Sequence, residues 1–140
     1  MRNMQPENGL TQEQYAAIAT FRFELRRFLA FSEAAAAAAG LPPQQHQALL
    51  AIAGHMGPEP LTVGLLADQL LIAPHTAAEL VSRMVVASLV TKTVSVHDRR
   101  RLELVLTAKA KALLHQLTEA HLQELKKLSP VLAKASNHEL

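Results

Sequence analysis

The sequence contains no cysteine, which excludes disulfide bonds, thiolate metal sites and cysteine-based redox sensing. Only five of the 140 residues are glycine, which leaves little room for a glycine-rich loop that holds a nucleotide cofactor. No apolar run approaches the length of a membrane span, and the polar first ten residues lack the apolar centre of a signal peptide. We therefore expect a cytoplasmic protein with no cofactor and no membrane partner.

Motifs of catalysis and metal binding are also missing. The chain has no HExxH sequence, no cysteine nucleophile and no close pair of carboxylates on one helix face. Its seven histidines are scattered, and the nearest helical pair, His115 and His121, is six residues apart and so falls on different faces. We predict that the protein is not an enzyme and has no metal site.

What the sequence does contain is a change of hydrophobic period between Pro74 and Thr107. The first part has helical spacing, and the second part has two alternating runs on either side of a short polar segment. The helical positions are Leu80, Val81 and Met84, and the alternating positions are Val90, Val94 and Val96, then Leu102, Leu104 and Leu106. This pattern predicts a helix followed by a β-hairpin.

The tip of the predicted hairpin, His97 to Arg101, reads HDRRR. A net charge of +2 for the whole chain is too small to argue for nucleic-acid binding. Between His75 and Arg101, however, five lysines and arginines face two acids, a local charge of 5 − 2 = +3 that attracts phosphate. A helix followed at once by a cationic hairpin is typical of a winged helix-turn-helix.

Signals for helix ends divide the remainder of the chain. Thr11 with Gln14 forms a capping box for a long helix over 11–39, which Gly40 ends. A second helix covers Pro43 to Ala53, and Thr62 caps a third helix that ends at Leu70 before a tight turn. After the hairpin, a helix over 107–128 is expected, with an interruption at Pro130 and a short final helix.

The two terminal helices hold more apolar surface than a small winged domain needs. On the second of them, apolar positions step by three and four, as in a coiled-coil seam, and His121 on this seam is interpreted as a satisfied interface histidine rather than a ligand. The seam consists of Leu114, Leu117, His121, Leu125 and Leu128. This surplus predicts a homodimer.

Several short motifs in order resemble the MarR family of bacterial transcription regulators. They cover roughly residues 40–117, and each is weak alone. The motifs are Leu41–Gln45, Leu61–Leu70, Leu80–Met84, the wing sequence Asp98-Arg99-Arg100, the pair Leu106-Thr107, and Lys109 through Leu113-Leu114.

The resemblance implies a mainly α fold with a small two-stranded β-wing and N- and C-terminal dimerisation helices. We expect one MarR-like domain over 1–140, with dimerisation helices at 11–39 and 107–140 and the winged DNA-binding lobe at 43–106. As in that family, the chain would form a homodimer, bind double-stranded operator DNA, and repress transcription until a small aromatic or anionic effector releases it.

Candidate DNA contacts lie on the predicted recognition helix, at a helix cap and on the wing. Asp98 is interpreted as structural, because a carboxylate repels phosphate, and an effector pocket is expected around Phe28 and His46. The candidate DNA contacts are Thr62, His75, Thr76, Glu79, Ser82, Arg83, Arg99, Arg100 and Arg101.

Among several departures from the family pattern, Glu79 together with the modest net charge leaves an alternative open. Glu79 stands where many relatives have a basic residue, and Ser88 stands where many have glycine. Arg83 fits either a DNA contact or an intramolecular ion pair. The alternative is a winged-helix protein-interaction module without specific DNA binding, which would lack the steep salt dependence of DNA binding.

Overall fold

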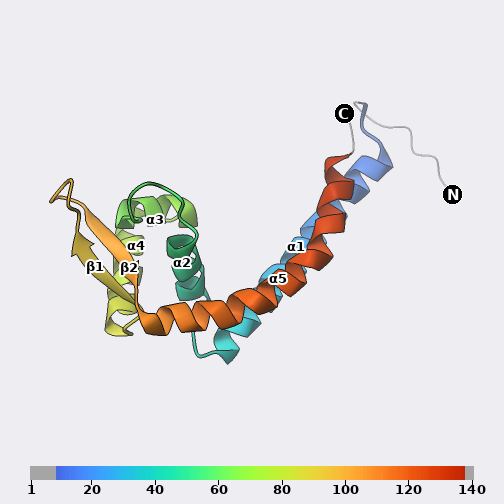
Figure 1. The fold of residues 1–140 in the computed structure, drawn as a ribbon. Helices are drawn as coiled ribbons and strands as arrows, with labels where there is room; N and C mark the ends of the chain where they lie inside the picture. The colour runs from blue at the N-terminus through green and yellow to red at the C-terminus, as the bar shows by residue number, and fades with distance from the viewer. Residues whose placement is uncertain (1–8, 138–140) are drawn as a thin grey trace. The chain divides into compact units, whose positions relative to one another are not determined.

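The structure, a computed structural model, describes residues 9–137 and divides into two compact units (Figure 1). A winged unit spans Ala36–Thr118, and a helical unit comprises the described parts of Met1–Ala35 and Glu119–Leu140. Two long helices, α1 (Gln12–Ala38) and α5 (Ala108–Ser136), contribute to both units. The predicted fold class, mainly α with a two-stranded wing, is confirmed.

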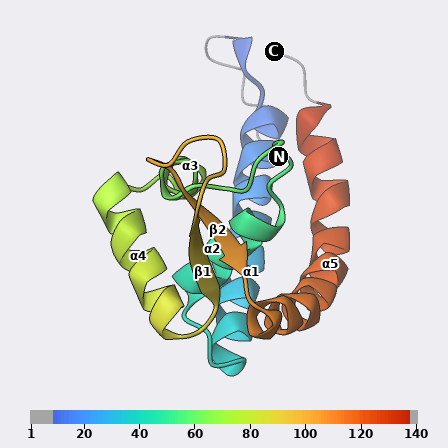
Figure 2. The ribbon, with the colours of Figure 1, turned by 60° about the vertical axis from the view of Figure 1, so that its left-hand side comes forward.

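In the helical unit, α1 and the C-terminal part of α5 run side by side in opposite directions (Figure 2). The capping box predicted at the start of α1 is present, since Gln14 N donates to Thr11 Oγ1 at 3.2 Å and Thr11 N donates to Gln14 Oε1 at 2.7 Å. His121 is buried with its Nε2 2.8 Å from Ser32 Oγ. The edges of two phenylalanine rings, Phe28 and Phe31, also contact the imidazole.

The predicted interruption at Pro130 is wrong, because α5 continues through it to Ser136. Proline lacks the amide hydrogen that would bond the carbonyl four residues earlier, and its ring crowds that carbonyl. Pro130 lies on an exposed part of the helix, where water can reach the carbonyl that the proline leaves without its helical donor. The helix therefore continues on both sides of Pro130 despite the loss of one backbone hydrogen bond.

The winged unit packs α2 (Pro43–Ala53), α3 (Val63–Leu70) and α4 (Pro74–Val86) against one side of a hairpin. The bounds predicted for α2 are confirmed, and α3 begins after the predicted Thr62 cap, whose Oγ1 accepts from Leu65 N. All of these elements contribute to one apolar core. Its largest fully buried side chains are Leu49, Leu61, Leu66, Met84, Leu104, Val81 and Val90.

Three helices of the chain end at a residue with left-handed backbone conformation. These residues are Gly40 after α1, Leu71 after α3 and Ser88 after α4, with φ of 76°, 56° and 61°. In each case the amide of the next residue donates to the carbonyl five residues before it, at 2.9–3.0 Å. Glycine adopts this conformation without strain, whereas a side chain adds a steric cost. Only the first of the three ends therefore carries the favoured residue.

The wing is an antiparallel hairpin of β1 (Val90–Val94) and β2 (Leu102–Leu106), in which Val90 pairs with Leu106. Of the alternating positions, Val90 and Leu104 are buried, whereas Val94 and Leu102 are exposed because the distal half of the hairpin extends beyond the core. A third extended segment joins β2 from the other side: Leu104 N donates to Leu61 O at 2.8 Å, and Thr62 bridges Glu103.

Candidate nucleic-acid interface

α4 has one buried apolar face and one polar face, as a recognition helix requires. Its buried residues are Ala77, Leu80, Val81 and Met84, and Pro74 occupies its first turn, where a missing amide hydrogen costs nothing. The five candidate contacts on α4 fall on the other side of the helix. His75, Glu79, Ser82 and Arg83 are exposed, and Thr76 is half-buried.

Two of these polar side chains differ in what they can offer to DNA. The hydroxyl of Ser82 donates to Ala78 O at 3.0 Å, so its proton is already used within the helix. Arg83 forms no ion pair with any of residues 9–137, which leaves its guanidinium free for a phosphate or a guanine. Exposed Glu79 lies one turn earlier on the same helix and places a negative charge there.

The wing tip is held in shape by local hydrogen bonds. Ser95 N donates to Arg101 O at 2.9 Å and closes the loop, while the buried Ser95 Oγ accepts from the amides of His97 and Asp98. The Asp98 carboxylate in turn accepts from Arg100 three times, from its backbone amide at 3.0 Å, from Nε at 3.2 Å and from Nη2 at 3.4 Å. The guanidinium of Arg100 is thus oriented by its neighbour two residues earlier.

The same contacts set the ionisation of Asp98. Hydrogen bonds from the Arg100 side chain and then from its backbone amide lower the pKa of Asp98 below its ordinary value of 3.8, with a further contribution from the charge of Arg101. The group therefore stays ionised at neutral pH. Its negative charge partly offsets the arginines beside it.

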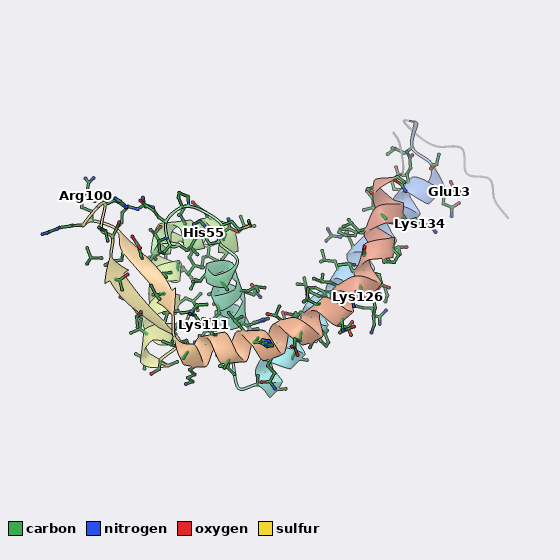
Figure 3. All side chains as sticks on the ribbon, in the orientation of Figure 1. Glu13, His55, Arg100, Lys111, Lys126 and Lys134 are labelled. Carbon is green, nitrogen blue, oxygen red and sulfur yellow. The ribbon has the colours of Figure 1, made fainter. Side chains whose placement is uncertain are left out.

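The three wing arginines differ in their partners. Arg100 projects from the hairpin tip (Figure 3) and pairs with Asp98, while Arg101 Nη1 lies 3.4 Å from Oε2 of Glu59 in the loop between α2 and α3. Arg99 is exposed and pairs with no acid in the part of the chain that the structure describes. Of the three wing arginines, one is therefore unpaired within the described residues and two are held by carboxylates.

Thr62 serves as the N-cap of α3 and also bridges β2, which places the start of this helix next to the wing. A recess of about 290 Å³ lies there, and its lining includes Gly64, Arg100 and Arg101. The positive end of the α3 helix dipole points to this recess. The guanidinium groups of Arg100 and Arg101 that line it are paired with Asp98 and Glu59.

The winged unit coincides with a region that matches a known family. Residues 39–101 match the sequence profile of the MarR family. This stretch of the winged unit is therefore similar to the MarR family. A comparison with curated protein sequences finds no significant match.

Solved structures share the fold of this chain. A MarR family protein from Bacillus stearothermophilus is 20% identical with a TM-score of 0.72, over 86% of this chain and 82% of the other. AbsC from Streptomyces coelicolor is 20% identical with a TM-score of 0.68, over 87% and 82%. The DNA complex of MepR from Staphylococcus aureus is 19% identical with a TM-score of 0.66, over 80% and 81%.

Two residues of the MarR-like motif at the end of the wing have a structural purpose. Thr107 Oγ1 accepts from Ala110 N at 3.1 Å, which caps α5, and donates to Ser88 O at 2.7 Å. Lys109 Nζ donates at 2.9 Å to Ala87 O at the C-terminal end of α4, where a cation also complements the helix dipole. These contacts fasten the end of the recognition helix to the start of α5.

The two residues expected around an effector pocket lie in different units. Phe28 belongs to the helical unit, where its ring edge meets His121 at a centroid distance of 5.8 Å, and His46 is buried in the winged unit. The pocket stays a prediction. Within residues 9–137, no three metal-ligating side chains gather into a group, and no helix is long and apolar enough to span a membrane.

Sequence reasoning missed Glu59 and the short strand beside it. Glu59 lies in a GPEP segment, 42 residues from Arg101, and nothing in that spacing indicates an ion pair. The bridge between Thr62 and Glu103 is a single residue pair, too short to leave an alternating pattern. Both features depend on the tertiary fold.

Proposed function

We propose that this chain is a sequence-specific DNA-binding transcriptional regulator. The observation that carries the proposal is the presence, in one winged unit, of a polar outer face on α4 and an arginine-bearing wing. Unpaired cations are available at both places, at Arg83 and at Arg99. In a winged helix, the recognition helix reads base edges while the wing and helix ends hold phosphates.

The likeness to a protein that binds DNA supports the proposal. The S. aureus MepR structure that shares this fold is a complex with DNA, and MepR is a transcription regulator of the multidrug efflux pump MepA. For the present chain, the candidate base contacts are on α4, and the wing arginines are candidates for the adjacent minor groove and its phosphates.

We further propose that the regulator acts as a homodimer joined through the helical unit. Large apolar side chains remain exposed there, on both α1 and α5, and an apolar surface of this kind marks a protein interface. A dimer would place two recognition helices in successive major grooves, with half-sites about 34 Å apart. The exposed side chains are Tyr15, Ile18, Phe23, Leu29, Leu122, Leu125 and Leu132.

Repression with release by a small aromatic or anionic effector completes the proposal. Because an operator-bound dimer blocks access to the DNA it covers, repression is the simplest consequence of binding near a promoter. A ligand releases the protein only if it binds the DNA-free conformation more tightly than the DNA-bound one. We place that ligand near Phe28 and His46, on the basis of the family resemblance.

Fluorescence anisotropy tests the proposal. The wild-type protein is titrated into a labelled duplex from its own upstream region and into a scrambled duplex of equal length, each at two salt concentrations. We expect tighter binding to the native duplex and a steep loss of affinity with salt on both. A folded protein that binds neither duplex would contradict the proposal.

Exposed Glu79 favours one alternative, a winged-helix module that binds protein rather than DNA. Its carboxylate lies on the face of α4 that would approach the phosphates. In that case Glu79→Lys is expected to create DNA binding that the wild type lacks. If the proposal is right, the wild type already binds and Glu79→Lys changes its base preference, since glutamate accepts from cytosine.

A further inference from the structure

An acidic residue that does not belong to the wing contacts the wing tip. Glu59, in the loop between α2 and α3, places Oε2 3.4 Å from Arg101 Nη1 and Oε1 4.0 Å from His97 Nε2. Among residues 9–137, Glu59 is the one acid whose ion pairs tie the wing to another part of the winged unit. Both contacts would draw the wing tip toward the start of α3.

The backbone holds Glu59 in this place. Two residues later, the carbonyl of buried Leu61 accepts from Leu104 N at 2.8 Å, and Thr62 bridges Glu103. Because this bridge is antiparallel, continued pairing would set Glu59 opposite Leu106, so the contact with Arg101, directly before β2, is made by the Glu59 side chain and not by strand pairing. The bridge thus anchors the α2–α3 loop beside β2, and the Glu59 side chain reaches Arg101 from that loop.

The exposure of the arginines follows from their partners. The side chain of Arg100 is 91% exposed, whereas that of Arg101 is 42% exposed and lies along the α2–α3 loop. Because an ion pair at the surface contributes little to stability, the main effect of Glu59 is electrostatic. It neutralises the charge of Arg101 and adds a carboxylate near the path of the phosphates.

We propose that Glu59 is a positioning residue that holds Arg101 as a brace of the wing and keeps it out of the DNA contacts. This inference rests on the proposed DNA-binding function. Arg99, which has no acid partner in the described residues, is then the wing arginine that neutralises a phosphate. Glu59 sets how much of the affinity depends on nonspecific charge, and therefore how strongly the protein relies on base readout by α4.

The competing possibility is that Arg101 leaves Glu59 when DNA approaches and binds a phosphate itself. The two possibilities differ in the salt dependence of DNA binding. Each phosphate that a cation neutralises adds about 0.9 to the magnitude of the slope of log affinity against log salt on B-DNA. The slope therefore reports whether Arg101 contacts DNA. A substitution that affects only folding would not change this slope.

The experiment is a double-mutant cycle in that slope, with the full-length wild type, Glu59→Gln, Arg101→Gln and the double variant. In the wild-type background, Arg101→Gln is expected to leave the slope unchanged. Glu59→Gln is expected to raise affinity and steepen the slope by about 0.9, and adding Arg101→Gln removes that increase.

Arg99→Gln is the matched control, because it removes a neighbouring arginine that has no acid partner in the described residues. It is expected to lower the slope by about 0.9 in the wild-type background. Arg101→Lys, which keeps the charge, checks that a change at this position does not act through folding. Arg101→Lys is expected to leave the salt slope unchanged both in the wild-type background and in the Glu59→Gln background. Circular dichroism checks the fold of each variant.

The outcomes separate this inference from the proposed function. If Arg101→Gln lowers the slope of the wild type as much as Arg99→Gln does, Arg101 contacts DNA and the inference is wrong, while DNA binding stands. If Glu59→Gln leaves both affinity and slope unchanged, the inference is also wrong. A wild-type protein without salt-sensitive DNA binding would contradict the inference and the proposed function together.

Discussion

Ser88 has the left-handed backbone conformation that glycine adopts most readily, with φ of 61°. The cost of this conformation for a residue with a side chain is about 1–2 kcal/mol. Replacing such a residue by glycine removes this strain, but the larger freedom of glycine in the unfolded chain offsets part of the gain in stability. The position is nevertheless well anchored, because Ser88 N donates to Val85 O and Ser88 O accepts from Thr107. Tertiary contacts thus maintain a strained end to the recognition helix.

We expect Ser88→Gly to raise the free energy of unfolding by about 0.5–1 kcal/mol. The measurement is urea denaturation at one fixed protein concentration, since the stability of a dimer depends on concentration. The same substitution at Ser82, inside α4, is the control and should lower stability by about 0.5–1 kcal/mol. Two changes of the same sign would show that backbone strain at Ser88 is not the cause.

Asp98 gives a pH-dependent prediction. Its pKa in the folded protein is lowered by Arg100, so its contribution to stability is complete above the ordinary value of 3.8 and disappears as pH falls through the lower folded value. The difference in unfolding free energy between wild type and Asp98→Asn should therefore be constant near pH 6 and shrink below about pH 4. A difference that grows with acidification would contradict the assigned contacts.

At the scale of single residues, contacts between sequence neighbours could be predicted, whereas contacts between distant residues could not. The interpretation of Asp98 as a wing residue beside arginines required only its immediate neighbours, and the structure places Arg100 on it. By contrast, the pair between Glu59 and Arg101 joins side chains that are 42 residues apart in the sequence. Local contacts can be inferred from adjacent residues, whereas distant ones need the fold.

At the scale of elements, the helices of the winged unit were predictable because their ends carry distinct signals. Pro43, Thr62 and Pro74 each mark a helix start, and the structure begins α2, α3 and α4 at or directly after them. The C-terminal helix was predicted wrongly because proline is a strong local signal for a break. The proline signal failed here because the other hydrogen bonds of the helix outweigh the one that Pro130 removes at an exposed site.

The continuity of α5 through Pro130 leads to a prediction. Pro130→Ala restores the bond to the carbonyl of Lys126 and should raise the free energy of unfolding by about 1–3 kcal/mol. The helical signal in circular dichroism should hardly change, because the helix already extends to Ser136.

The neighbouring Ser129→Ala, also exposed, is the control and should change stability by less than about 0.5 kcal/mol. Hydrogen exchange gives a direct check on the wild type. The amides of residues 131–136 should be protected, and rapid exchange throughout that range would indicate that the helix ends near Pro130.

For the whole molecule, the division into two units separates two tasks. The winged unit, Ala36–Thr118, has seven lysines and arginines against five acids, a net charge of 7 − 5 = +2. The helical unit exposes seven large apolar side chains along α1 and α5. We therefore assign DNA binding to the winged unit and self-association to the helical unit, and we expect charge changes in one to leave the function of the other intact.

The most direct test of this account compares two double variants that each remove two positive charges. Arg99→Ala with Arg100→Ala alters the wing, and Lys126→Ala with Lys127→Ala alters the helical unit. Anisotropy with the native duplex at several salt concentrations should show weaker binding for the wing variant and a salt slope smaller by at least about 0.9, with the slope of the helical variant unchanged. Equal losses in the two variants, or no loss in the wing variant, would contradict the assignment of DNA binding to the winged unit.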